Sequence, residues 1–125
     1  MPRCIKGLQP NKRLGTRPSC LQSLPELKII EHHVAHAEMR DRCVKAVSVF
    51  SSPEGCTYFY LDRREAHIYV SKDFPTPWVL RHERLHAAGH DHIGSDGMKR
   101  MLANWKARVR ERDYRIEAAA EAFTY

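Results

Sequence analysis

The clearest chemical feature of the chain is the stretch HERLHAAGHDH, which brings several histidines and one glutamate into residues 82–92. Residues four apart on a helix lie on the same face, so His82 and His86 can direct two imidazoles at one point. Gly89 tolerates the positive φ with which a chain leaves a helix, and His92 follows it closely. The spacing therefore predicts a metal site of three histidines. Chance alone gives this pattern in about 1 in 10,000 chains of this composition.

The metal expected here is zinc, one ion per chain, with three imidazole ligands: His82, His86 and His92. Three protein ligands leave the fourth tetrahedral position for a water molecule, as in catalytic sites, and zinc lowers the pKa of that water. Glu83 adjoins the first ligand, and we expect it to act as the general base. Asp91 is expected to accept a hydrogen bond from an imidazole or to lie in solvent. A closed structural site, completed by His90 or Asp91, is the alternative.

These eleven residues resemble the signature of the metzincin zinc peptidases, H-E-x-x-H-x-x-G-x-x-H, and match it at every specified position. The resemblance implies zinc on the three histidines and Glu83 as general base and acid. It also implies a substrate peptide laid along an edge strand, for which residues 66–71 are the candidate. Metzincins usually are longer and place a methionine in a tight turn below the zinc, whereas Met98 and Met101 fall in a predicted helix.

The motif also resembles that of the YbeY-type single-strand endoribonucleases, which have three histidines at this spacing and a G-x-D-H ending, as in residues 89–92. The predicted strand at 66–71 and the following Met-bearing helix are similar to that family's small α/β architecture. Its motifs usually lack a glutamate after the first histidine, so Glu83 favours the peptidase. We therefore expect a zinc metalloprotease. An endoribonuclease is the first alternative, and a non-catalytic zinc-stabilised binding or structural protein is the second.

The formal net charge of +6 is unevenly distributed. Residues 1–20 carry five basic side chains and no acidic one, and residues 98–115 carry seven basic side chains against two acidic ones. Such zones suit RNA, DNA or an acidic partner, and they equally suit a solvated surface. A peptide or protein is the expected substrate, with RNA as the alternative partner through both basic zones. The oligomeric state is not indicated.

Length and composition indicate one ordinary globular domain of 125 residues. No apolar run reaches the length of a membrane span, and the first ten residues lack the apolar core of a secretory signal. We therefore expect no membrane contact and a cytoplasmic location. The four cysteines are widely spaced, with no C-x-x-C pair: Cys4, Cys20, Cys43 and Cys56. Without a secretory signal, free thiols are expected.

Residues 1–24 are rich in proline and glycine and are expected to form an irregular basic segment. Residues 25–125 are expected to form a single zinc metallohydrolase domain. Helical periodicity predicts a first helix over about 25–41. It includes an i,i+4 histidine pair, His32 and His36, which lacks a third ligand and is expected on a solvated or packed face.

The middle of the chain is rich in aromatic and β-branched residues, which predicts a meander of three strands at 43–50, 56–62 and 66–71. A helix over about 77–88 follows, with Thr76 as N-cap and Pro77 in its first turn. Apolar residues then recur at helical spacing from Met98 to Phe123, which predicts a long C-terminal helix. The expected fold is therefore α+β: a small sheet of about three strands, a zinc-binding helix and a long C-terminal helix.

Overall fold

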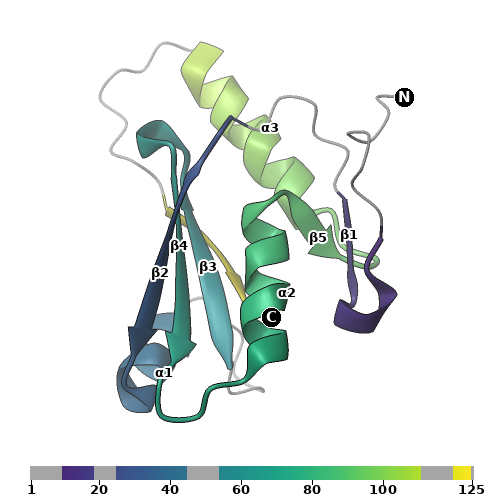
Figure 1. Cartoon of the computed structure of the whole chain (residues 1–125). Coiled ribbons are helices and arrows are strands. Elements are labelled where there is room, and N and C mark those ends of the chain that lie inside the picture. Colours follow the sequence, from purple (N-terminus) through teal and green to yellow (C-terminus); the bar gives the residue numbers. More distant parts are fainter. Residues whose placement is uncertain (1–9, 19–24, 45–53, 111–119, 125) are drawn as a thin grey trace.

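The computed structural model describes residues 10–18, 25–44, 54–110 and 120–124 (Figure 1). Over these residues the fold is mixed α+β, with three α-helices, a two-stranded sheet and a four-stranded sheet, so the expected class is confirmed. In chain order the elements are η1 (Lys12–Leu14), β1 (Thr16–Pro18), β2 (Lys28–Val34), α1 (His36–Val44), β3 (Gly55–Tyr60), η2 (Leu61–Arg63), β4 (Glu65–Ser71), α2 (Pro77–Ala87), β5 (His90–His92), α3 (Gly97–Arg110) and β6 (Ala120–Thr124).

The larger sheet has the strand order β2-β4-β3-β6. β3 and β4 form an antiparallel hairpin through η2, which confirms the hairpin predicted from residues 56–62 and 66–71. β2 joins β4 in parallel, and β6 joins β3 in an antiparallel pairing. β4 therefore lies inside the sheet between β2 and β3, and the prediction that residues 66–71 form an exposed edge is wrong.

Residues 28–34 form strand β2, so the predicted helix at 25–41 is wrong over this stretch. All seven residues of β2 pair with β4, whose residues lie 37 positions later in the chain. Helical periodicity reports only local preference, and this long-range pairing outweighs it. The β-branched side chains of the strand also suit an extended backbone: Ile29, Ile30 and Val34. Helix α1 begins only at His36.

α1 occupies part of the stretch where the sequence predicts the first strand of the meander. Cys43 and Val44 are its last residues, so the predicted strand at 43–50 is wrong for them, and residues 45–50 lie outside the described part of the chain. The meander thus contributes two strands, and the sheet is completed by β2 and β6, which come from distant parts of the sequence.

Cys43 forms a disulfide with Cys56 of β3, so the prediction of free thiols is wrong for this pair. The two cysteines meet because α1 packs against the sheet, beside Met39 and Tyr69. This tertiary contact is not visible from cysteine spacing. The other two cysteines, Cys4 and Cys20, lie outside the described residues.

The C-terminal helix is shorter than predicted. α3 ends at Arg110, residues 111–119 lie outside the described part of the chain, and residues 120–124 form β6 instead of further helical turns. In β6, Phe123 lies opposite Thr57 of β3, 66 positions earlier in the chain. As with β2, long-range strand pairing overrides a locally helical pattern.

η1 and β1 belong to the segment that was expected to be irregular, and that description is wrong for residues 12–18. β1 pairs with β5, with Thr16 opposite His92. The carbonyl of Gly15 also accepts a hydrogen bond of 2.9 Å from the amide of Ile93. This segment is therefore fastened to the strand that carries the third predicted ligand. The division into two regions at residue 24 stays a prediction.

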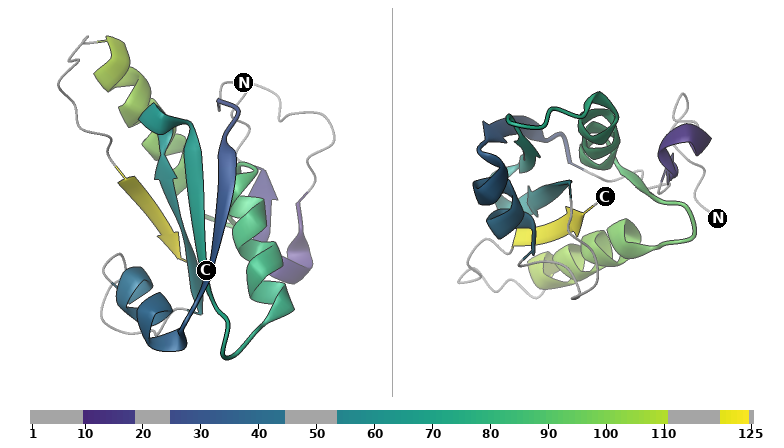
Figure 2. Two further views of the ribbon diagram at one scale, coloured as in Figure 1. Left: turned by 60° about the vertical axis from the view of Figure 1, so that its left-hand side comes forward. Right: turned by 90° about the horizontal axis from the view of Figure 1, so that it is seen from below.

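Each face of the four-stranded sheet has its own apolar core, and α1 and α2 lie on opposite sides of the sheet (Figure 2). Because side chains alternate along a strand, β4 contributes Ala66, Ile68 and Val70 to the larger core, under α2 and α3, and Tyr69 to the smaller one, under α1. The candidate site lies on the α2 side.

Among the described residues, no helix has the length and apolar character needed to cross a membrane.

Candidate metal centre

Helix α2 supplies two of the three predicted ligands. Pro77 lies in its first turn, where a missing amide hydrogen costs no hydrogen bond, and Thr76 is the N-cap as predicted. The Thr76 hydroxyl, however, donates to the carbonyl of Phe74 and does not cap the helix. The side chains that α2 buries recur at spacings of three and four: Val79, His82, Glu83, His86 and Ala87. Burial of this face therefore fixes both histidines and the glutamate in place.

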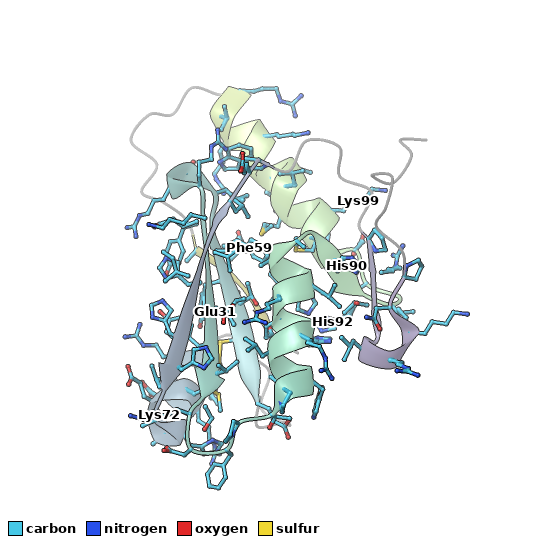
Figure 3. All side chains as sticks on the ribbon, in the orientation of Figure 1. Glu31, Phe59, Lys72, His90, His92 and Lys99 are labelled. Carbon is cyan, nitrogen blue, oxygen red and sulfur yellow. A yellow bond between two sulfur atoms is a disulfide. The ribbon has the colours of Figure 1, made fainter. Side chains whose placement is uncertain are left out.

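The chain reverses after α2 and returns as β5, which carries the third predicted ligand. Gly89 has a φ of 103°, the left-handed conformation that its place in the motif predicts. His90 and His92 both come from β5, beside α2 (Figure 3). Pairing of β5 with β1 then holds His92 in register.

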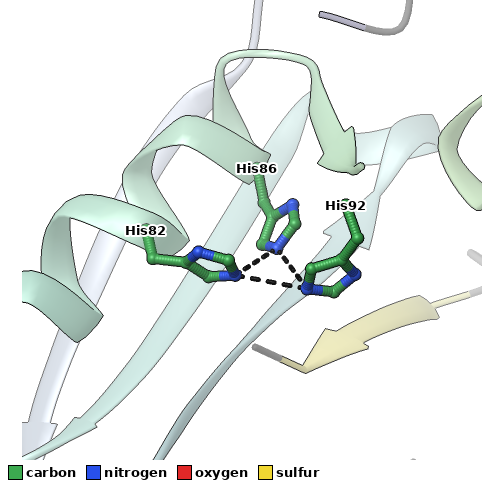
Figure 4. Close-up of side chains that lie close together, drawn as sticks. All are labelled: His82, His86 and His92. Carbon is green, nitrogen blue, oxygen red and sulfur yellow. Dashed lines mark hydrogen bonds between the residues drawn. The ribbon is translucent and has the colours of Figure 1, made fainter. Parts of the chain in front are cut away.

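The three predicted ligands converge on one point (Figure 4). The Nε2 atoms of His82 and His86 are 3.0 Å apart, and each lies 3.2 Å from Nε2 of His92. Two nitrogens bound to one tetrahedral zinc are separated by about 3.3 Å, given Zn–N bonds of about 2.0–2.1 Å. The three histidines therefore lie close enough together to bind a metal ion, as the spacing predicts.

The protonation of the imidazoles explains why a cation fits this point. Nδ1 of His82 lies 2.7 Å from the carbonyl oxygen of Leu14, and Nδ1 of His86 lies 2.7 Å from that of His90. A carbonyl only accepts, so each Nδ1 carries the proton, and Nε2 of a neutral imidazole then presents a lone pair. Two lone pairs 3.0 Å apart repel each other unless a cation lies between them.

The environment keeps these imidazoles neutral. Burial lowers the pKa of His86 to about 3, and it also lowers the pKa values of His82 and His92 below their ordinary value. His82 and His86 are only 4% and 0% exposed, whereas His92 is half-buried. Metal ligation requires neutral imidazole, so the folded chain already holds the three rings in the form that binds.

Two backbone carbonyls, and not the predicted Asp91, orient the imidazoles of His82 and His86. The carboxylate of Asp91 is buried and accepts hydrogen bonds from the amides of His92 and Met98, both at 3.0 Å. Both expectations for Asp91, an imidazole acceptor or an exposed side chain, are wrong. Sequence reasoning missed the carbonyl of Leu14, because a carbonyl oxygen has no signature in the residue type.

Glu83 is fully buried, and its carboxyl group packs against β3. The hydroxyl of Thr57 donates to Oε1 over 2.8 Å, while Oε2 has no hydrogen-bond partner among the described residues. Burial raises the pKa of Glu83 to about 8, and the hydrogen bond from Thr57 acts in the opposite direction. The motif identified Glu83, but nothing in the sequence identified Thr57 as its partner. Its role as general base stays a prediction.

The other histidines do not join the centre. The ring of His90 is buried outside the group of three, so it does not complete a closed structural site among the described residues. His32 lies on β2, and not on a helix, where its Nε2 is 2.8 Å from Nδ1 of His67 on β4. His36, at the start of α1, contacts the ring of Phe74 edge to face. The i,i+4 pair predicted at His32 and His36 is therefore split between two elements.

Two further features flank the three histidines. The ring of Phe123, on β6, lies 6.2 Å from the ring of His86. A surface hollow of about 250 Å³ lies next to η1 and is lined by two arginines and three other residues: Asn11, Leu14, Arg81, Arg84 and Leu85. Arg84 also binds Glu31 of β2 through two hydrogen bonds of 2.7 and 2.9 Å. Leu14 thus connects the hollow to the ring of His82.

Comparison with protein-family models, with curated proteins and with solved structures finds no match for this chain.

Proposed function

We propose that the chain is a zinc-dependent hydrolase that cleaves peptide bonds, with His82, His86 and His92 as the metal ligands. The observation that carries the proposal is the convergence of three neutral imidazoles through their Nε2 atoms. Zinc suits such a ligand set. Within the described ranges no fourth histidine, cysteine or carboxylate joins the group, which supports an open coordination position over a closed structural one.

Glu83 and Thr57 form the proton-handling part of the proposed site. When bound, zinc polarises a carbonyl and makes water a stronger nucleophile at neutral pH. Burial alone keeps Glu83 protonated at neutral pH, and the positive charge of a bound zinc ion would lower its pKa. Oε2, which lacks a hydrogen-bond partner among the described residues, would then take up a proton and pass it to the leaving amine. Thr57 acts as a positioning residue, because its hydroxyl holds Oε1 against β3.

A peptide is the favoured substrate because an extended segment already lies beside the centre. β6 runs antiparallel along β3 and brings Phe123 next to His86. Backbone hydrogen bonds between strands do not depend on sequence, so the same edge suits other extended peptides. In this proposal the substrate lies along the edge of β3 that β6 covers in this structure, and not along residues 66–71.

The test uses the zinc-loaded chain with casein or a quenched fluorescent peptide. Wild type cleaves the substrate, and a chelator stops the cleavage. Glu83→Gln lowers kcat by about 100-fold or more while one zinc per chain is retained. Thr57→Val also lowers kcat and retains zinc, whereas Thr76→Val, which removes a hydroxyl outside the site, leaves kcat unchanged. Full activity of Glu83→Gln contradicts the proposal.

An endoribonuclease is the second candidate, and the hollow beside Leu14 favours it. Its two arginines and the basic residues of η1, Lys12 and Arg13, place positive charge near His82, which suits a phosphodiester. In this case single-stranded RNA is cut, peptides are not, and Arg81→Ala weakens RNA binding. Zinc binding without cleavage of either substrate indicates the non-catalytic alternative.

A further inference from the structure

Strand β6 covers the edge of β3 beside the metal centre. Its five residues pair antiparallel with β3, from Ala120 opposite Tyr60 to Thr124 opposite Cys56. β6, yellow in Figure 4, reaches the histidines through Phe123, whose ring lies 6.2 Å from that of His86. β6 is therefore an extended peptide segment at the place where the proposed substrate must lie.

Phe123 packs against the larger core next to His86, and the residues that its ring contacts there are called the Phe123 pocket. Its ring meets Phe59 edge to face at 5.2 Å and lies 6.2 Å from the ring of His86. Gly97, at the start of α3, completes the pocket, because a Cβ atom there would lie 3.2 Å from the Phe123 ring. Cross-strand neighbours share a face, so Phe123 also lies on the same side of the sheet as Thr57, which holds Glu83.

Among the described side chains of β6, Phe123 is the one that packs against the larger core. Ala120 and Ala122 are small and Ala120 is exposed, which leaves Phe123 as the large apolar contact of the strand. By comparison, β2 pairs with β4 over seven residues, and β3 pairs with β4 over six. An edge strand held by backbone pairing and one aromatic ring can be replaced by another peptide that offers both.

We propose that β6 is an internal occupant of the peptide-binding edge, and that the pocket around Phe123 receives an aromatic side chain of the substrate once β6 leaves. This inference rests on the peptidase activity proposed above. β6 would then restrain activity until a peptide with an aromatic residue competes for the edge of β3.

The test measures binding of a fluorescein-labelled peptide, AEAFTY, which copies residues 120–125. It uses the zinc-loaded full chain carrying Glu83→Gln, which keeps the peptide intact, with and without Phe123→Ala. Emptying the pocket tightens peptide binding by about tenfold or more, and the peptide AEAATY binds about tenfold more weakly than AEAFTY. The control Ala122→Ser, on the opposite face of β6, leaves binding unchanged. Equal affinity of the two peptides, or of the two chains, overturns the inference.

A second measurement on the wild-type chain guards against misfolding of the Phe123 variant. Excess AEAFTY accelerates hydrogen exchange at residues 120–124 while the amides of β3 stay protected, because the peptide replaces β6. Unchanged exchange in β6 contradicts the inference. Casein cleavage distinguishes failure of the proposed function from failure of this inference. Binding of AEAFTY without cleavage of casein contradicts the peptidase activity and supports peptide binding at the edge of β3. Cleavage of casein with equal affinity for AEAFTY and AEAATY contradicts only the role proposed for β6.

Discussion

At the scale of single residues, three side chains of the proposed centre, His82, His86 and Glu83, each use one of their two polar atoms in a hydrogen bond that orients the side chain. His82 and His86 each use Nδ1 on a backbone carbonyl, which fixes the ring and directs the Nε2 lone pair inward. Glu83 uses one carboxyl oxygen on Thr57 and keeps the other unpartnered among the described residues. In each of these side chains, one polar atom makes the orienting hydrogen bond, and the other is the atom to which the proposal assigns metal binding or proton transfer.

The buried carboxyl of Glu83 predicts a pH dependence of stability in the metal-free chain. Its pKa is raised from 4.5 to about 8, so between these pH values the folded chain keeps a proton that the unfolded chain loses. The free energy of unfolding then falls as pH rises, by up to about 1.4 kcal/mol per pH unit. Glu83→Gln lacks this dependence, so it gains stability relative to wild type as pH rises.

Urea unfolding of both chains, across the range from the ordinary pKa of Glu83 to its raised value, measures this difference. The comparison cancels the titration of the histidines, which both chains share. A constant difference between wild type and Glu83→Gln over that range would show that Glu83 does not carry a raised pKa.

At the scale of elements, the centre combines parts that are distant in sequence. η1 supplies the carbonyl that is hydrogen-bonded to His82, α2 supplies two of the proposed ligands, and β5 supplies the third. β3 supplies Thr57, the hydrogen-bond partner of Glu83. The smaller sheet fixes β5 against β1, and the larger sheet supports α2. α1 and its disulfide lie on the other side of the larger sheet and touch none of these ligands.

Removal of the disulfide is therefore expected to lower the free energy of unfolding without changing metal binding. The double variant Cys43→Ala/Cys56→Ala loses the cross-link between α1 and β3, which costs about 2–4 kcal/mol of unfolding free energy. Zinc stoichiometry stays the same, because the cross-link lies on the face away from α2. Urea unfolding and metal analysis of the two chains check both parts. Loss of zinc in the double variant would contradict the separation of the two faces.

At the scale of the whole molecule, the sequence predicts what depends on local spacing and misses what depends on long-range contact. The three ligands and the bend at Gly89 follow from a motif of eleven residues, and the hairpin follows from strand-forming residues near one turn. The helical periodicity over β2 and β6 is misleading, because strand partners 37 and 60–68 positions away decide the conformation of these two segments. The disulfide also depends on tertiary packing. Disulfides are typical of oxidising environments, and the cytoplasmic location expected from the sequence stays a prediction.

The most direct test of the account is zinc analysis of four purified chains: wild type, His86→Ala, His92→Ala and His90→Ala. His86 and His92 come from different elements but share one proposed ion, while the ring of His90 lies outside the group, which makes it the matched control. We expect one zinc per chain in wild type and His90→Ala, and less than about a tenth of that in the other two. Full zinc occupancy after His92→Ala would contradict the three-histidine centre on which the proposed function depends.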